Sequence, residues 1–280
     1  MGVEVFLLIM GVWLMIAAAV GLRRSAPDLD AARAVRTRID AIYREPHEFT
    51  PADPAAFPEA DLAFYQRAQR ELTTRHFVML ADVEDLTITR AYPTGRTFMR
   101  LFVDHGGLIR ASAYHVAPRG VVLSILQLVQ VVPRHMRVLE LVTEIGQTFI
   151  TTANTGGSDR LDAPPEVQIE RMPPSAGLGA VVARHQQRVA EALRQAPDRL
   201  PTAMETYDDV MASMARAHVA LARYRNAVGG ISRDELTRLK GRPLTAYEEA
   251  FLQAVQDAAS PPQATTSDAP PSSQQAKTSS

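Results

Sequence analysis

The feature that most constrains the fold is an apolar run at the N-terminus. Residues 5–22, VFLLIMGVWLMIAAAVGL, contain no charged side chain, and Arg23 and Arg24 follow them directly. At about 1.5 Å per residue, a helix of this length spans about 27 Å, close to the thickness of the hydrocarbon core of a bilayer. The sequence therefore predicts that residues 1–24 form a transmembrane anchor that contacts the lipid bilayer.

The arginines around the apolar run predict its orientation. Lys and Arg near a span mark its cytoplasmic side, whereas acidic residues count for little. No Lys or Arg precedes the run, whereas Arg23 and Arg24 follow it and more arginines occur in residues 33–38. We therefore expect a single-pass protein of the plasma (inner) membrane, with its N-terminus outside and its C-terminal part in the cytoplasm.

Two other interpretations of the N-terminus stay open. Residues 17–19 are all Ala and could form the cleavage site of a signal peptide, which would make the protein an exported periplasmic domain. A signal peptide, however, begins with a positively charged segment and has a shorter apolar core, of about 7–15 residues. The chain begins Met-Gly-Val-Glu, without such a charge. The run could also be a buried core helix, which its position at the chain terminus disfavours.

Composition excludes several classes of protein. The chain of 280 residues contains no cysteine, which excludes a domain held together by disulfides. Lys and Arg total 30 and Asp and Glu total 31, so the net charge of −1 provides no basic field for nucleic acid. Arg90, Arg96, Arg100 and Arg110 lie among aromatic residues that could stack bases, but this charge balance argues against a nucleic-acid partner.

The residues after the anchor predict a helical stalk over 25–45. Ala32, Val35, Ile39 and Ile42 recur at spacings of three and four residues, which is the a/d pattern of a heptad. A dimerising coiled coil needs three or four heptads, and about two are present. The spacing therefore favours a stalk that packs on its own domain or lies on the lipid surface, with weak self-association through the stalk as the alternative.

A proline-rich linker is expected at 46–58, followed by an antiparallel, β-rich α+β domain over 59–155 that begins with a helix. FVMLADVED and LTITRAY look like strands joined by a short turn. Two hairpins follow, one turning at Gly106-Gly107 and one at 144–147, because glycine supplies the positive φ that tight hairpin turns need. Residues 121–132, VVLSILQLVQVV, could be a core strand, a buried helix or a membrane-contacting segment, and β-branched residues slightly favour the strand.

The C-terminal part is predicted to be helical. A loop is expected at 156–175, a helical region at 176–258 and a disordered tail at 259–280, because the tail is rich in Pro, Ser, Thr and Gln and has no apolar stripe. Three capping boxes predict helix starts, in which a hydroxyl and a Glu satisfy each other's backbone amides. They begin at Thr202, Ser232 and Thr245.

The sequence offers only weak candidates for a catalytic site. They are Asp104, His105, His115 and Glu84. If the first hairpin turns at Gly106-Gly107, His105 faces Leu108 and His115 faces Phe98, so the two histidines are too far apart to share a metal. Glu84 belongs to an acidic cluster that is expected to be a solvated turn.

No other pattern in the sequence predicts a cofactor, a metal or a nucleotide. The chain has no phosphate-binding glycine loop, no Cys ligand and no His-Glu helix motif. His185 and His218 are expected to be satisfied residues of a core or its rim. No cofactor is therefore predicted.

The expected fold is α+β: an N-terminal transmembrane helix, a hairpin-built antiparallel sheet with a leading helix, and a C-terminal helical subdomain. The expected function is a non-enzymatic interaction or scaffold module with an unknown protein partner, held in the cytoplasm by its anchor. The alternatives are a membrane-bound enzyme whose site is assembled from the scattered candidates above, and the exported domain.

Overall fold

The computed structural model describes residues 28–44, 46–91, 93, 96–116, 135–156 and 161–258. Within these ranges the protein has a mixed α+β fold with a seven-stranded sheet and seven α-helices. No helix of the described part is long and apolar enough to cross a membrane. The expected anchor with Arg23 and Arg24, the run 121–132 and the tail 259–280 lie outside the described residues, so those expectations stay predictions.

The sheet follows the order of the chain, β1-β2-β3-β4-β5-β6-β7. Neighbouring strands pair antiparallel, except that β6 and β7 are parallel. The strands are β1 (Phe49–Pro51), β2 (Phe77–Asp85), β3 (Phe98–Asp104), β4 (Arg110–Val116), β5 (Met136–Ile145), β6 (Thr148–Ala153) and β7 (Val167–Arg171).

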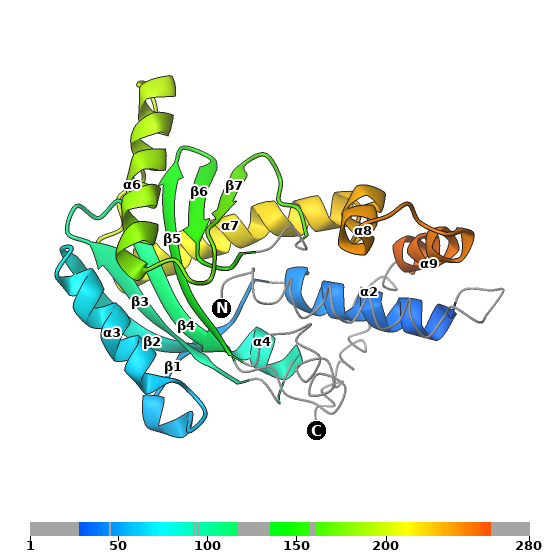
Figure 1. The fold of residues 1–280 in the computed structure, drawn as a ribbon, viewed down its shortest axis with the longest axis horizontal. Helices are drawn as coiled ribbons and strands as arrows, with labels where there is room; N and C mark the ends of the chain where they lie inside the picture. The colour runs from blue at the N-terminus through cyan, green and yellow to red at the C-terminus, as the bar shows by residue number, and fades with distance from the viewer. Residues whose placement is uncertain are drawn as a thin grey trace, which may run out of the picture.

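Helices cover both faces of this sheet (Figure 1). One face carries α3 and α6; the other carries α7, and α2, α8 and α9 extend from that side. The helices are α2 (Leu29–Tyr43), α3 (Leu62–Thr73), α4 (Leu86–Ala91), α6 (Leu178–Gln195), α7 (Tyr207–Ala227), α8 (Arg233–Lys240) and α9 (Ala246–Asp257), with a 3₁₀ turn, η2 (Pro54–Ala56).

The alternation of side chains along the central strands divides the core in two. On β3, Phe98 and Phe102 pack with α3 and α6, whereas Met99 and Leu101 pack on the side of α7. Successive side chains of a strand point to opposite faces. Both faces are covered, so β3 and β4 are buried along nearly their whole length.

The predicted apolar stripe of the stalk is confirmed, and it is part of the protein's own core. Ala32, Val35, Ile39 and Ile42 are all buried in α2. The helix packs against α9, α7 and α4. These four side chains are therefore not on the surface where a second copy could contact them.

Both predicted hairpins are confirmed. In the first, Met99 pairs with Tyr114, which is the register expected for a turn at Gly106-Gly107. In the second, Ile145 pairs with Thr148, so the turn is centred on Gly146 and Gln147, one residue later than the expected turn at 144–147. Gly107 and Gly146 have positive φ values of 68° and 62°, a conformation in which a Cβ atom is strained.

The expected strand over LTITRAY is wrong, because Leu86–Ala91 forms the short helix α4. The carboxylate of Asp85 accepts a hydrogen bond from the backbone N–H of Ile88 at 3.0 Å. A residue that caps the N-terminus of a helix accepts a hydrogen bond from a free backbone N–H in this way. The chain therefore leaves the sheet at the last acidic residue of β2. The expected linker also contains β1, and the expected loop 156–175 contains β7.

Two of the three predicted capping boxes are confirmed, at Ser232 with Glu235 and at Thr245 with Glu248. The third is wrong by one helical turn, since α7 begins at a box formed by Thr206 and Asp209. The backbone of Thr202 instead donates to the carbonyl of Glu144, so this segment runs along the end of the sheet before the helix starts.

His185 joins α6 to the sheet, and it is a satisfied core residue as predicted. Its Nε2 lies 3.0 Å from the hydroxyl oxygen of Thr143, and its Nδ1 lies 3.0 Å from that of Thr152. Burial, reinforced by the nearby charges of Arg188 and Arg110, lowers the pKa of His185 to about 3. The folded protein therefore holds this ring neutral.

We predict that His185 destabilises the fold in mild acid. Between about pH 6.5 and 3 the unfolded chain binds a proton that the folded chain does not, so stability is complete above that window and falls as the pH is lowered through it. Between pH 7 and 5 the wild-type free energy of unfolding should fall by about 2 kcal/mol more than that of His185→Gln. Urea unfolding at both pH values measures this difference, and equal pH dependence of the two proteins would contradict the prediction.

Candidate functional site

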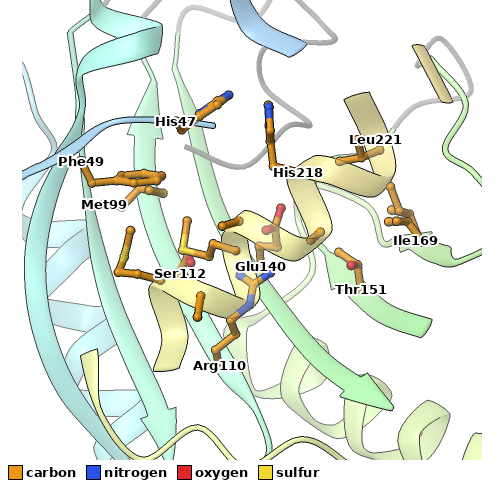
Figure 2. A pocket seen from close by; sticks show the side chains of 16 residues that line it. His47, Phe49, Met99, Arg110, Ser112, Glu140, Thr151, Ile169, His218 and Leu221 are labelled. Atoms are coloured by element: carbon orange, nitrogen blue, oxygen red, sulfur yellow. The ribbon is translucent and has the colours of Figure 1, made fainter. Parts of the chain in front are cut away.

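A cavity of about 370 Å³ lies between the sheet and α7. Strands β1, β3, β4, β5, β6 and β7 contribute to its lining, and α7 closes its other side. Figure 2 shows side chains from strands and helix converging on this space, with His47 and His218 at its top and Arg110 at its bottom. Small residues of α7 form part of its lining, namely Ala212, Ala215 and Ala217.

Most of the lining is apolar and part of it is adaptable. Met99 comes from the sheet, and Met211 and Met214 come from α7. Methionine is unbranched and fills irregular space, so it can repack around ligands of different shape. The other large apolar side chains of the wall are Phe49, Val167, Ile169 and Leu221.

Arg110 places a cation among these apolar groups. It begins β4 and pairs with Val142 of β5. On β5, Glu140 and Glu144 are the diagonal neighbours of Arg110 and lie on the same face of the sheet. Long side chains can contact each other across this spacing. Arg110 is only 5% exposed, and its side chain lines the cavity (Figure 2).

The guanidinium of Arg110 makes no hydrogen bond or ion pair within the described part of the chain, and its buried Nε atom is left without a partner. A guanidinium carries five N–H donors, and buried donors are normally satisfied. Burial lowers the pKa of Arg110, whereas the charges of Glu140 and Glu144 act in the opposite direction. Arg110 is thus a buried cation with acidic neighbours but without an acceptor of its own.

The acidic neighbours of Arg110 have other partners. Glu144 is held by Arg216 of α7 through two contacts, Nε to Oε1 at 2.7 Å and Nη2 to Oε2 at 2.8 Å. Glu140 lies beside Ser112 in the paired strands, and both line the cavity with Thr151. At this end of the cavity the polar groups lie on the strands, opposite the methionines of α7.

A histidine pair lies at the other end of the cavity. The rings of His47 and His218 have centroids 4.5 Å apart. The Nδ1 atom of His47 lies 2.5 Å from a carboxylate oxygen of Asp85, and its Nε2 lies 3.1 Å from the carbonyl oxygen of Ile42. Both partners are acceptors, so both contacts are hydrogen bonds only when the ring carries two protons. This arrangement holds His47 in place on both sides.

The structure does not bring the four predicted catalytic residues together. Asp104 stabilises the hairpin turn, because its Oδ1 accepts hydrogen bonds from the backbone N–H groups of Leu108 and Ile109. His105 follows it in the same turn and is exposed. These two residues lie at the end of β3 opposite to Phe98, which is about 20 Å along the strand at about 3.3 Å per residue.

Glu84 and His115 lie near the other end of β3, with that strand between them. Glu84 pairs with Phe98 and is held by Arg96 through two contacts of 2.8 Å. These bonds lower the pKa of Glu84 although its burial acts in the opposite direction. His115 contacts His135 at 3.1 Å between Nε2 and Nδ1. Across two strand spacings, roughly 10 Å, Glu84 and His115 do not reach each other.

The four arginines that were considered for nucleic-acid binding do not form one surface in the structure. Arg90 pairs with Glu48, Arg96 with Glu84, and Arg100 with Asp82. Arg110 lies on the opposite face of the sheet from Arg100, since residues 99, 101 and 103 share a face with 114, 112 and 110. In the described ranges, no group of three or more His, Cys, Asp or Glu side chains is positioned to hold a metal.

Sequence reasoning missed the cavity, although one signal for it exists. In the run Arg110-Ala-Ser-Ala-Tyr114, the residues at alternate positions 110, 112 and 114 share one face, and the first two are polar, whereas the residues between them are alanines. Polar groups on a buried face call for partners. The contribution of His47 and α7 could not be read from the sequence, because they lie far from β4 along the chain.

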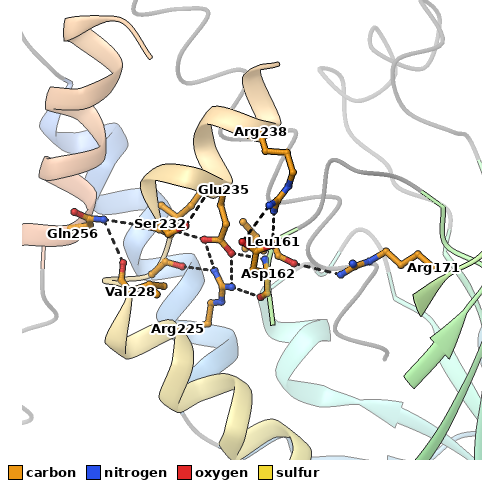
Figure 3. Close-up of polar contacts among 11 residues, drawn as sticks. Leu161, Asp162, Arg171, Arg225, Val228, Ser232, Glu235, Arg238 and Gln256 are labelled. Carbon is orange, nitrogen blue, oxygen red and sulfur yellow. Dashed lines mark hydrogen bonds and ion pairs between the residues drawn. The ribbon is translucent and has the colours of Figure 1, made fainter. Parts of the chain in front are cut away.

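A second buried polar cluster joins α7, α8 and the segment before β7 (Figure 3). Arg225 and Glu235 are 1% and 0% exposed and form an ion pair at 2.6 Å. Arg225 also donates to the carbonyl oxygens of Gly230 and Asp162, and Glu235 accepts from the backbone N–H of Asp162 and of Ser232. Acceptors surround this cation, so the cluster is structural and contrasts with the environment of Arg110.

Comparison of the chain with protein-family models, curated proteins and solved structures finds no match.

We predict that Arg225→Met strongly destabilises the fold. The substitution leaves the carboxylate of Glu235 buried without its cation, and removing one partner of a buried pair typically costs about 3–5 kcal/mol. Urea denaturation monitored by circular dichroism gives this difference in the free energy of unfolding.

The matched control is Arg233→Met, which breaks an ion pair with Glu249 whose side chains are 64% and 36% exposed. Exposed pairs contribute only about 0–1 kcal/mol. A loss at Arg225 no larger than the loss at Arg233 would show that the buried network does not hold α7 to α8.

Proposed function

We propose that this protein is a membrane-tethered, non-enzymatic binding module that takes a small, mainly apolar ligand into the cavity between its sheet and α7. The observation that carries the proposal is the cavity itself, about 370 Å³ in volume and lined by the sheet and α7. Sites for small molecules typically have volumes of about 300–1,000 Å³ and apolar walls with a few polar groups. This cavity fits the lower end of that range.

The chemistry of the lining favours binding over catalysis. Both ring nitrogens of His47 lie within hydrogen-bond distance of protein atoms, a carboxylate oxygen of Asp85 and the carbonyl oxygen of Ile42. Proton transfer needs a base within hydrogen-bond reach of a reacting group. The four residues first considered for an enzyme, His105, Asp104, His115 and Glu84, lie at two separate places in the fold and form no common site.

The membrane tether in this proposal rests on residues 5–22 and on Arg23 and Arg24. Helix α2 begins at Leu29, so only a short segment separates the folded part from the anchor. Basic residues beside an anchor are attracted to anionic lipid. Apolar ligands concentrate in bilayers, and a binding module tethered at the surface meets them at a high local concentration.

The proposed cellular arrangement keeps the folded part in the cytoplasm. The proposal includes a protein partner that binds this module when its cavity holds a ligand. Co-purification with the full-length protein in mild detergent would identify the partner. Extraction of the full-length protein from isolated membranes tests the anchor.

We predict that the full-length protein stays in the membrane pellet after washing with alkaline carbonate, because a spanning helix is held by its apolar length and not by charge. Deletion of residues 1–24 should release it. External protease added to spheroplasts should leave the C-terminal part intact. Release of the full-length protein by carbonate, or its digestion from outside, contradicts the tether or its orientation.

We predict that a small apolar probe enters the cavity in the full-length protein reconstituted in lipid nanodiscs. Octanamide and octanoate are suitable probes, and ¹³C-methyl NMR of the methionines reports their position. The methyl signals of Met99, Met211 and Met214 should shift, because these residues line the cavity. Met79 and Met172 pack with the core on the other face of the sheet and should not shift.

Substitutions on α7 provide the matched control. Ala217→Phe places a ring in the cavity and should weaken probe binding by about tenfold or more, whereas Val219→Phe lies at an exposed position that is 47% accessible and should leave binding unchanged. If neither probe shifts the three methionines, the binding function is wrong.

A further inference from the structure

Arg110 is the feature of the cavity that its apolar lining does not explain. The side chain is nine-tenths buried or more, it lines the cavity, and its guanidinium makes no hydrogen bond or ion pair with the described residues. A buried polar group left without a partner is expensive and calls for an explanation. A ligand that supplies the acceptor is such an explanation.

We infer that the cavity selects ligands with a single carboxylate on an apolar body, and that the guanidinium of Arg110 binds this carboxylate. The inference rests on the proposed binding function and names the class of ligand. Guanidinium and carboxylate are planar groups whose hydrogen-bonding geometries match, which is why arginine recognises carboxylates so often.

Other arginines of the protein already show this pairing. Arg96, Arg100 and Arg216 each hold a carboxylate through Nε and Nη2, at distances of 2.7–2.8 Å. The buried Arg225 holds Glu235 through both of its terminal nitrogens. Arg110 is buried like Arg225 but lacks a carboxylate of its own within the described part of the chain. A carboxylate brought by a ligand gives Arg110 a pairing with a carboxylate through two contacts, as each of the other four has.

The charges around Arg110 limit the ligand to one negative charge. Glu140 and Glu144 lie on the diagonals of Arg110 and would repel a second charge on the ligand. Glu144 is held by Arg216, and Glu140 lines the cavity itself, so a second negative charge on the ligand would lie close to a carboxylate. A phosphate monoester with two charges is disfavoured for this reason, whereas a carboxylate brings one.

The rest of the cavity determines the body of the ligand. Away from Arg110 the wall is formed by methionines of α7 and by Phe49, Ile169 and Leu221. A cavity of about 370 Å³ holds a single short acyl chain or a small aromatic acid, and is too small for a phospholipid with two chains. Free short- and medium-chain fatty acids have the required chemistry.

The test compares three probes of the same length on the full-length protein in nanodiscs, with empty nanodiscs subtracted. Octanoate carries the carboxylate, octanamide is its neutral isostere, and octylammonium carries the opposite charge. Titration of the signals of Met99, Met211 and Met214 gives a dissociation constant for each probe. We expect octanoate to bind about tenfold tighter than octanamide, as is typical of hydrogen bonds to a charged group.

Three variants assign the preference to Arg110. Arg110→Met should reduce the ratio between octanoate and octanamide to about one, and Arg110→Lys should restore part of it by keeping the charge. Arg233→Met removes the same charge at a distant exposed site and should leave the ratio unchanged. Binding of octanamide by Arg110→Met shows that this variant is folded, and Arg110→Lys provides the readout if it is not.

The outcomes separate this inference from the proposed function. If octanoate and octanamide bind equally in the wild type, or if octylammonium binds tightest, the cavity binds ligands but the carboxylate inference is wrong. Retention of the octanoate preference in Arg110→Met also overturns it. If no probe binds, both the inference and the binding function fail.

Discussion

Burial of both faces of the sheet is the constraint on which the rest of this structure depends. Strands β3 and β4 lie between α3 and α6 on one side and α7 on the other. Any polar side chain on these strands must therefore find a partner inside the protein or in a cavity. His185, with Thr143 and Thr152, follows the first course. Arg110 follows the second, and for this reason the cavity beside α7 acquires a specific chemistry.

The two buried arginines, Arg110 and Arg225, have different surroundings. Arg225 is surrounded by a carboxylate and by carbonyl oxygens, and its cluster holds α7 to α8. Buried polar networks whose members are hydrogen-bonded to one another make the surrounding core rigid. Arg110 has charges near it but no hydrogen-bond acceptor in contact among the described residues, and we propose that a ligand in the cavity supplies one. The difference lies in the neighbours of each cation, and not in its depth of burial.

Local sequence signals predicted a large part of the fold. The hairpin at Gly106-Gly107, its register and the helix starts at Ser232 and Thr245 depend on residues close together in the chain. The errors have local causes too: the acidic end of β2 caps a helix where a strand was expected, and α7 starts one turn late. The cavity could not be predicted, because β4, α7 and the segment around His47 meet only in the folded protein.

The contact between α2 and α9 has a consequence for how the chain is made. These are the first and last helices described, and the apolar stripe of α2 is covered partly by α9. During synthesis the stripe leaves the ribosome early, and its cover arrives only when nearly the whole chain has been translated. Until then part of the apolar stripe of α2, which includes Ile39 and Ile42, lacks its cover, and contacts between residues so distant in sequence form slowly. The nascent protein thus passes through a period in which a chaperone can occupy the place later taken by α9.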